Sequence, residues 1–206
     1  MTSLLRDSLK QYIGEEEQDF FYGIDRASKR IIRTIDMIVN YSRFQIGDFP
    51  YSPKMYDMDK LINDLVKEFN STFAAKNLPL EFSNKLGKIN LNLDEYSIIQ
   101  AIGNILDNAV KFTSVGFVKL MLYKDLSNQV CLDIKDTGKG ISPEYIDNLF
   151  KPYSQEESGY NRSFEGIGLG LSLVKKYLDL NNCEISVQSE KDKGTTFTIK
   201  FPKAEV

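Results

Sequence analysis

The sequence predicts an α+β fold, in which helices cover one face of a mixed, largely antiparallel sheet and an antiparallel helical hairpin precedes them. Two observations support this prediction. In several long segments apolar residues recur at every third or fourth position, which is typical of amphipathic helices. Shorter segments alternate apolar and polar residues, which is typical of strands with one buried face.

The N-terminal part of the chain is predicted to be the helical hairpin. Residues 2–13 form its first helix and residues from about 18 to 46 form the longer second helix. The second helix carries a narrow stripe of apolar residues. A stripe of this kind needs a partner, which the first helix, a second copy of the chain or the chain's own second domain could supply. The stripe has the three- and four-residue steps of a coiled-coil seam and consists of Phe21, Ile24, Ile31, Ile35 and Ile38.

A domain boundary is predicted at about residue 50. Gly47, Pro50 and Pro53 end the helical pattern there, which gives domains of residues 1–49 and 50–206. In the second domain helices are predicted at residues 57–76, 95–112 after Asp94 as N-cap, 143–150 after Ser142 as N-cap, and 169–181. Strands are predicted at residues 80–82, 89–93, 117–123, 129–135, 185–189 and 195–201, and a polar loop at residues 151–165.

The composition is that of an ordinary globular protein. Of the 206 residues 42% are apolar and 27% charged, and the net charge of −3 gives no reason to expect binding to nucleic acid. No apolar run is long enough to cross a bilayer and no signal peptide opens the chain, so we expect no membrane contact by this part of the protein. Cys131 and Cys183 are expected to be buried thiols of a reducing, cytoplasmic compartment.

The stretch Asp136-Thr137-Gly138-Lys139-Gly140-Ile141 follows a predicted strand and is the first candidate for chemistry. Its glycines allow the backbone to come close to a ligand. A carboxylate at the end of a strand can accept a hydrogen bond from a flat donor such as an adenine amine. Taken alone, the stretch is explained more simply as an ordinary turn between a strand and a helix.

Three polar residues share one face of the predicted helix at residues 95–112. Asn104, Asn108 and Lys111 stand at positions i, i+4 and i+7. Amide oxygens suit a hard cation such as Mg²⁺, which proteins bind mainly through the phosphates of a substrate. A lysine suits a phosphate as a point charge. A solvated helix face explains the same pattern equally well.

A glycine-rich segment, Gly166-Ile167-Gly168-Leu169-Gly170-Leu171, leads into the predicted helix at residues 169–181. Free N–H groups at a helix N-terminus can bind an anion, and a flexible hinge is the alternative. The spacing differs from the dinucleotide fingerprint and no βαβ unit surrounds it, which argues against a Rossmann fold. The segment at residues 194–197, Gly-Thr-Thr-Phe, predicts only a hairpin turn when taken alone.

Together and in this order, the stretches resemble the N, G1, F, G2 and G3 boxes of the GHKL ATP-binding fold, in its sensor histidine kinase branch. Residues 18–49 look like the second helix of the dimerisation and phosphotransfer hairpin of that branch, so the resemblance covers essentially the whole chain. It implies the GHKL (Bergerat) two-layer α/β sandwich, with ATP as substrate and Mg²⁺ as cofactor. The boxes correspond to residues 104–113, 136–141, 149–153, 166–171 and 194–197.

The resemblance implies roles for the residues at the base end of the site. Asp136 would bind the adenine amine, and Gly138 and Gly140 would shape the pocket around it, with Ile141 as a further member of the nucleotide-binding set. Thr195 would support the carboxylate from the next strand.

The resemblance also implies roles at the phosphate end. Asn108 would hold the Mg²⁺ ion that bridges the phosphates, and Asn104 would support it. Lys111 would contact phosphate, so that Asn104 and Lys111 are the catalytic candidates. Phosphoryl transfer requires mainly positioning and charge neutralisation, which these residues would supply.

A lid over the nucleotide is implied as well. Phe150 would anchor the near end of the lid at residues 151–165, and Arg162 within it is a candidate for a γ-phosphate contact. Gly166, Gly168 and Gly170 would form the hinge of the lid and offer backbone N–H groups to the phosphates, with Leu169 as a further member of the nucleotide-binding set.

Two departures from the family pattern are present. Asn182-Cys183 stands where the family often has two glycines, and asparagine tolerates the left-handed conformation that such a turn needs. The chain also contains no histidine, whereas family members carry a phospho-accepting histidine on the first hairpin helix. We therefore expect the chain to be a truncated piece of a longer kinase. The sequence leaves open whether that kinase is anchored in a membrane.

Other functions within the fold are less well supported. The gyrase, mismatch-repair and chaperone ATPases carry a glutamate four residues before the Mg²⁺-binding asparagine, where it activates water. Here that position is Asn104, which cannot act as a base. Serine kinases of the anti-sigma type normally lack a long helical hairpin, and a non-catalytic scaffold would not need all the boxes.

The expected function is therefore ATP-dependent phosphorylation of a histidine that this chain does not contain. The resemblance implies a homodimer that forms through the helical hairpin. It also implies that the phosphoryl group passes to an aspartate on the receiver domain of a response regulator.

Overall fold

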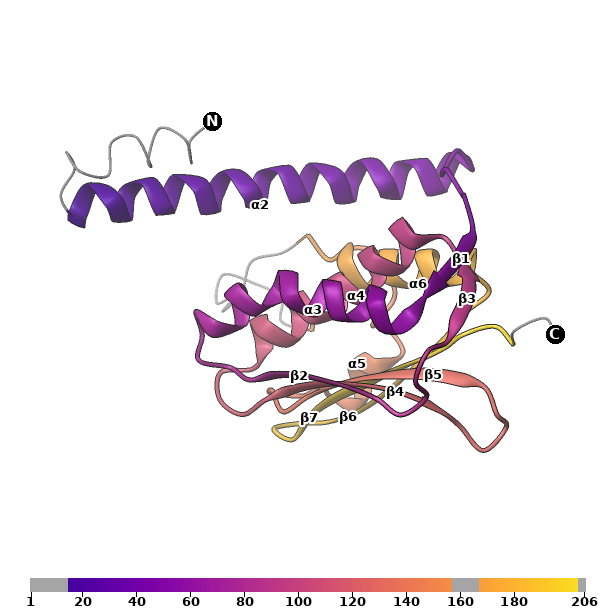
Figure 1. The fold of residues 1–206 in the computed structure, drawn as a ribbon. Coiled ribbons are helices and arrows are strands. Elements are labelled where there is room, and N and C mark those ends of the chain that lie inside the picture. Colours follow the sequence, from indigo (N-terminus) through magenta and orange to yellow (C-terminus); the bar gives the residue numbers. More distant parts are fainter. Residues whose placement is uncertain (1–14, 157–166, 204–206) are drawn as a thin grey trace. The chain divides into compact units, whose positions relative to one another are not determined.

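The computed structural model describes residues 15–156 and 167–203, and the chain divides into two compact units, residues 1–48 and 49–206. Figure 1 shows the elements of both units in the colours of the sequence. The helix predicted at residues 2–13 lies outside the described residues.

The described part of the first unit is one long helix, α2 (Glu15–Ile46), which covers the residues predicted as the second hairpin helix. Three isoleucines of its apolar stripe are exposed. Ile31, Ile35 and Ile38 are 60%, 54% and 51% exposed. Apolar side chains in such a row stabilise a helix only when another surface packs on them. The assignment of α2 to a dimerisation hairpin stays a prediction.

The second unit is built on a five-stranded sheet with the strand order β2-β4-β5-β7-β6. Strands β2 and β4 run parallel, and the three other neighbouring pairs run antiparallel. This arrangement confirms the predicted mixed, largely antiparallel sheet. The strands are β2 (Leu80–Asn84), β4 (Val118–Lys124), β5 (Val130–Asp136), β6 (Glu184–Glu190) and β7 (Gly194–Lys200).

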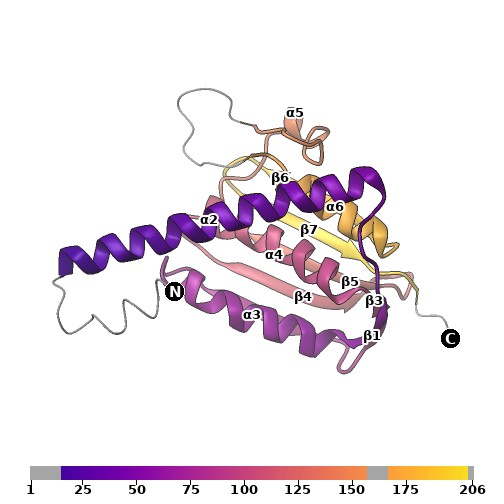
Figure 2. The same ribbon diagram turned by 90° about the horizontal axis from the view of Figure 1, so that it is seen from above.

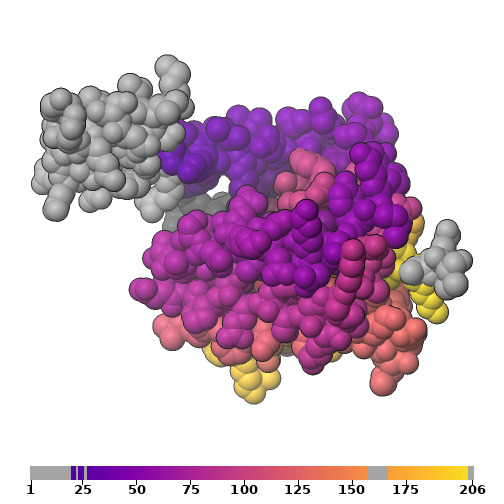
Figure 3. All heavy atoms as spheres, viewed as in Figure 1, coloured from indigo at the N-terminus to yellow at the C-terminus, as the bar shows by residue number. Residues whose placement is uncertain are grey.

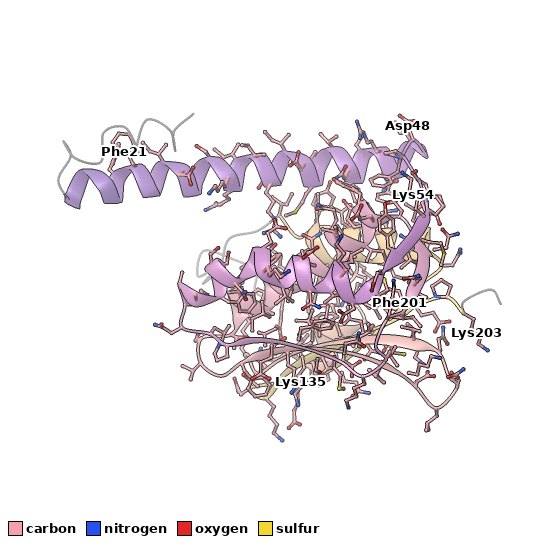
Figure 4. The ribbon with its side chains drawn as sticks, viewed as in Figure 1. Phe21, Asp48, Lys54, Lys135, Phe201 and Lys203 are labelled. Carbon is pink, nitrogen blue, oxygen red and sulfur yellow. The ribbon has the colours of Figure 1, made fainter. Side chains whose placement is uncertain are left out.

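Three helices lie side by side over one face of this sheet, as Figures 1 and 2 show. They are α3 (Met58–Ala74), α4 (Glu95–Phe112) and α6 (Gly170–Leu180). Side chains fill the space between the two layers: Phe201 is fully buried there, whereas Lys135 points away from the helices on the opposite face (Figure 4). Figure 3 shows α3 packed into a continuous surface on one side of the unit. The two-layer α+β prediction is confirmed.

Two aspartates fix the starts of α3 and α4. Asp57 Oδ1 accepts a hydrogen bond from the backbone N–H of Asp59 at 3.1 Å. Asp94 Oδ1 accepts from the N–H of Ser97 at 2.9 Å, as the sequence predicted for the N-cap of α4. These bonds satisfy N–H groups that the first turn of a helix leaves without a partner.

The structure differs from the predicted elements in two places. A short strand, β1 (Lys54–Asp57), pairs with β3 (Asn90–Leu93) in a separate two-stranded sheet that the sequence did not predict. The helix predicted at residues 143–150 is only α5 (Pro143–Ile146), and turns follow it.

The predicted cap of α5 is confirmed in its position but not in its contacts. Ser142 stands at the N-cap position, but its side chain makes no capping bond, and its backbone N–H donates to Glu156 Oε1 at 2.9 Å. The helix start is therefore held by a residue 14 positions further along the chain, which local sequence rules do not reveal.

Two smaller predictions are confirmed. Asn182 adopts φ +53°, the left-handed conformation expected where the family often has glycine. Cys131 and Cys183 are free and buried, and burial raises the pKa of Cys183 to about 12. Among the described helices none is both long and apolar enough to cross a membrane.

Candidate functional site

The carboxylate of Asp136 lies at the end of β5, where the sheet register places it opposite Thr195 of β7. Oδ1 of Asp136 accepts hydrogen bonds from the backbone N–H groups of Gly138 at 2.8 Å and Thr195 at 3.3 Å. Within the described ranges no donor is bound to its Oδ2, and only 8% of the residue is exposed. The strand end therefore holds a nearly buried carboxylate in a fixed orientation.

The environment of Asp136 disfavours its charge. Burial raises the pKa of this carboxyl, and the two backbone hydrogen bonds lower it to a smaller extent. Burial acts in this direction because a low-dielectric surrounding destabilises the ionised form. An N–H donor on a ligand would favour the ionised form, so the site is suited to a polar hydrogen-bond donor such as an aromatic amine.

The turn after Asp136 requires glycine at residue 140. Gly140 has φ +63°, and a Cβ atom there would lie 2.0 Å from the carbonyl oxygen of Glu190. The turn is tied to the β6–β7 hairpin because the N–H of Asp192 donates to the Lys139 carbonyl at 2.8 Å. The same hairpin thus fixes both Thr195 and the turn around the carboxylate.

Ser189 is a residue of this site that sequence reasoning missed. Its Oγ accepts a hydrogen bond from the N–H of Ile141 at 2.8 Å and lies 2.8 Å from Thr195 Oγ1. It therefore connects the end of the turn to the strand that supports Asp136. No sequence signal marks it, since it is one of several polar residues on an alternating strand.

Helix α4 carries the three polar residues predicted for the phosphate end. Asn104 is buried, whereas Asn108 and Lys111 are half-buried. A solvated face is therefore excluded for Asn104. No cluster of three or more histidine, cysteine, aspartate or glutamate residues that could hold a metal ion occurs in the described part of the chain. A divalent cation here would depend on amide oxygens and on the oxygens of a bound ligand.

Two ammonium groups lie close to one aromatic ring at the end of α4. The Nζ atoms of Lys111 and Lys139 are 4.8 Å and 4.7 Å from the centroid of the Phe112 ring. The backbone of Phe112 also contacts the Asp136 turn, since its carbonyl accepts the N–H of Lys139 at 3.1 Å. The end of α4 and the turn therefore each contribute an ammonium group to the Phe112 ring, and Lys139 is a second residue that the sequence analysis did not assign.

The two ends of the predicted lid between β5 and α6 are joined by a backbone hydrogen bond. The N–H of Tyr153 donates to the Gly168 carbonyl at 2.9 Å, and Gly168 has φ +72° with the Tyr153 backbone directly against it. Phe150 is half-buried in the turns after α5, Leu169 is buried at the N-cap of α6, and Gly170 begins that helix. Arg162, Gly166 and residues 157–165 of the predicted lid lie outside the described residues.

Glu156 connects this segment to the base end. Its Oε1 accepts the Ser142 N–H at 2.9 Å and pairs with Lys191 Nζ at 3.1 Å. Burial alone would raise the pKa of Glu156, but the hydrogen bonds from Ser142 and Lys191 outweigh it and lower this pKa. Lys191 belongs to the β6–β7 turn, so the start of the predicted lid is held beside the Asp136 turn.

The sequence of this chain matches a known protein family and several known proteins. Residues 93–205 match the family described as histidine kinase-, DNA gyrase B- and HSP90-like ATPase. The autoinducer 2 sensor kinase/phosphatase LuxQ of Vibrio parahaemolyticus is 28% identical over 98% of this chain and 24% of its own length. The sensor histidine kinase RcsC of Salmonella typhimurium is 29% identical over 87% of this chain and 19% of its own length.

Solved structures share the fold. Full-length ShkA in complex with AMPPNP gives a TM-score of 0.75 at 20% identity and covers 94% of this chain and 40% of ShkA. The histidine kinase AdeS of Acinetobacter baumannii gives 0.72 at 19% identity over 99% of this chain and 94% of AdeS. ThkA in complex with the response regulator TrrA gives 0.69 at 18% identity over 98% of this chain and 57% of that chain. The chain spans about a fifth to a quarter of the LuxQ and RcsC sequences.

Proposed function

Because this chain belongs to the histidine kinase-, DNA gyrase B- and HSP90-like ATPase family, we propose that it is the ATP-binding catalytic region of a sensor histidine kinase. In this proposal it transfers the γ-phosphoryl group of ATP to a histidine on a dimerisation hairpin. That histidine lies outside the present sequence, which contains none. The phosphoryl group is then relayed to an aspartate of a response regulator.

The observation that carries the proposal is the Asp136 site. A nearly buried carboxylate, held by the Gly138 and Thr195 backbone with Oδ2 unengaged among the described residues, suits the exocyclic amine of adenine. Gly138, Gly140 and Ile141 shape this end of the site, and Thr195 supports the carboxylate. The base would thus be fixed at the end of β5, with the phosphates directed toward α4.

Residues of α4 fit the phosphate end. Asn108 would contribute an amide oxygen to Mg²⁺, which is otherwise held by the phosphates and water, and Lys111 would offset the phosphate charge. The ion would neutralise charge that develops during phosphoryl transfer. The start of α6 would also face the phosphates through its free backbone N–H groups, which belong to Gly168, Leu169 and Gly170.

Asn104 favours a kinase over an ATPase. An ATPase of this fold needs a carboxylate to take a proton from the attacking water, and an amide cannot accept that proton. The buried Asn104 of α4 is therefore suited to support Asn108 in holding the ion and not to activate water. A nucleophile supplied by another segment of protein fits this site better.

The relatives support the same proposal. LuxQ and RcsC are a sensor kinase/phosphatase and a sensor histidine kinase by name, and ThkA forms a complex with a response regulator. We therefore infer a receiver domain as the downstream partner. We place the protein in the cytoplasm, where ATP and response regulators are available.

The test of this function is phosphotransfer in trans. The chain is incubated with Mg·[γ-³²P]ATP and with a separately purified helical hairpin of a LuxQ-type kinase that carries the acceptor histidine. We expect acid-labile, base-stable phosphate on the hairpin and none on the chain itself. A hairpin with the histidine replaced by glutamine serves as the control. Labelling of the chain alone, or of the control hairpin at the same rate, would contradict the proposal.

We further propose that α2 contributes to a homodimer. Ile31, Ile35 and Ile38 form an exposed apolar row on α2 that a helix of a second copy would cover. The variant Ile35→Lys is expected to weaken self-association by roughly tenfold or more, because it places a charge in the buried seam.

Sedimentation velocity over a range of concentrations measures this effect. Lys29→Ala is the matched control, since Lys29 is exposed and pairs with Asp25 on the same helix. At about 100 μM the measurement detects a dimer whose free energy of association is at least roughly 6 kcal/mol. If the wild-type chain stays monomeric up to this concentration, dimerisation through α2 alone is excluded.

A further inference from the structure

Thr113 carries a buried hydroxyl without a hydrogen-bond partner. The residue is fully buried, and in residues 15–156 and 167–203 its Oγ1 is the buried side-chain polar atom that is left unsatisfied. Such atoms are rare in folded proteins, and a ligand-dependent interaction is one explanation for them. Thr113 follows α4, where its backbone N–H donates to the Ala109 carbonyl at 3.0 Å. The hydroxyl, and not the backbone, is therefore the group without a partner.

The hydroxyl faces the turn that follows Asp136. A Cβ atom added to Gly138 would lie 2.8 Å from Thr113 Oγ1, 2.9 Å from Asp136 Oδ1 and 2.5 Å from the carbonyl oxygen of Phe112. These three oxygen atoms therefore surround the same side of Gly138. A side chain at residue 138 would fill the space between the hydroxyl and the carboxylate, and glycine leaves it open.

The groups around Thr113 Oγ1 already have hydrogen-bond partners, so among the described residues the Thr113 hydroxyl is the donor near Asp136 that still lacks one. The Gly138 and Thr195 N–H groups are already bound to Asp136 Oδ1. The Phe112 carbonyl accepts the Lys139 N–H at 3.1 Å. A hydroxyl rotates freely and both donates and accepts, so it can bond to the carboxylate after a small movement of the turn.

We propose that Thr113 is a further positioning residue for the base, whose hydroxyl donates to the Asp136 carboxylate when a purine amine is bound there. This inference rests on the proposed function, because it needs adenine at Asp136. An additional donor stabilises the ionised carboxylate that accepts from the amine. Binding of the base thus provides a partner for a hydroxyl that has none among the described residues, and this contribution is measured as an increase in nucleotide affinity.

Thr113→Val separates this role from a structural one. Valine keeps the shape of threonine and removes the hydroxyl. Since the hydroxyl has no partner among the described residues, its removal leaves no bond broken, and we expect the melting temperature of the variant measured without nucleotide to be unchanged or higher. The affinity for ADP, measured by calorimetry, is expected to fall by roughly 3- to 10-fold, the value of one hydrogen bond.

Two further variants complete the experiment. Thr113→Ser keeps the hydroxyl and is expected to bind ADP within about twofold of wild type. Ser97→Ala is the matched control for a satisfied buried hydroxyl, because Ser97 Oγ donates to the Asp94 carbonyl at 3.0 Å and accepts from Asn181 Nδ2 at 2.7 Å. It is expected to lower the melting temperature and leave ADP affinity unchanged.

Three results would overturn the role of Thr113 alone: wild-type affinity in Thr113→Val, a lowered melting temperature of nucleotide-free Thr113→Val, or equal losses of affinity in Thr113→Val and Thr113→Ser. A wild-type chain that binds no ADP would instead overturn the proposed function, and this inference with it. The wild-type titration therefore distinguishes the two failures.

Discussion

Asp136→Asn is expected to weaken ATP binding by roughly 10- to 100-fold, the value of a hydrogen bond to a charged group, while the fold stays intact. Asparagine has the size of aspartate, and its oxygen can still accept from the Gly138 or Thr195 N–H groups at the position of Oδ1. The Oδ2 position then holds an NH₂ group. Two donors would face each other there if adenine bound in the proposed orientation, so the base loses its acceptor.

The stability of this variant follows from the pKa shift of Asp136. Burial raises the pKa of the folded-state carboxyl above its ordinary value, so the ionised form destabilises the fold at pH values above that pKa. A neutral asparagine removes this penalty. We therefore expect Asp136→Asn to be at least as stable as wild type at pH 7. The difference should shrink as the pH falls through the raised pKa and vanish below the ordinary pKa of an aspartate, where the carboxyl is protonated in both the folded and the unfolded state.

Asp133→Asn is the matched control for this substitution. Asp133 lies on the same strand, where its Oδ1 accepts from Thr198 Oγ1 at 2.7 Å and Tyr123 Oη at 3.2 Å. It precedes Asp136 by an odd number of residues and so points to the other face of the sheet. Calorimetry should show normal ATP affinity for this variant. Equal affinity in Asp136→Asn and wild type would remove the adenine role of Asp136.

Asn108→Ala is expected to abolish the dependence of ATP binding on Mg²⁺ and to reduce phosphotransfer. The amide is the protein ligand proposed for the ion, and it stands one helical turn before Lys111 on α4. Loss of even an outer-shell partner typically costs about 10- to 100-fold in metal affinity, and we expect at least this loss for a direct ligand. Titrations with ATP in the presence of Mg²⁺ and of EDTA measure the effect.

Asn63→Ala serves as the control for Asn108→Ala. Asn63 lies on α3, and its side-chain amide donates to the Asp59 carbonyl at 2.9 Å. Its removal is expected to change stability slightly and Mg²⁺ dependence not at all. If Asn108→Ala kept the wild-type ratio of affinities with and without Mg²⁺, the metal role assigned to Asn108 would be incorrect.

Much of the fold was predictable because its helices and strands have clear local signals. The N-cap at Asp94, the β4–β5 hairpin and the left-handed Asn182 each follow from a pattern a few residues long. The strand β1 was not predicted, since its four residues are too few to show alternation and it is fixed by pairing with β3. For α5 the start at Pro143 was predicted correctly and the end was not, because turns replace the helix after Ile146.

In the site, too, residues that belong to short sequence motifs were predicted, whereas residues that act through distant contacts were not. The resemblance to the family boxes implied that Asp136 and Thr195 act together, and the sheet register places them opposite each other. Ser189 and the unpaired hydroxyl of Thr113 became apparent only in the structure, because each depends on contacts between segments far apart in the sequence. Hydrogen bonds between such segments leave no periodic signal, so sequence reasoning finds the boxes and misses the residues that join them.

The most direct measurement of the central claim, that the Asp136 turn holds the base of a nucleotide, is an ADP titration followed by ¹H–¹⁵N correlation spectra. We predict that the amide signals of Gly138 and Thr195, which donate to Asp136, shift progressively and saturably. Signals of β2, at the edge of the sheet, should stay in place. Saturable binding that left the Gly138 and Thr195 signals unmoved would contradict the claim.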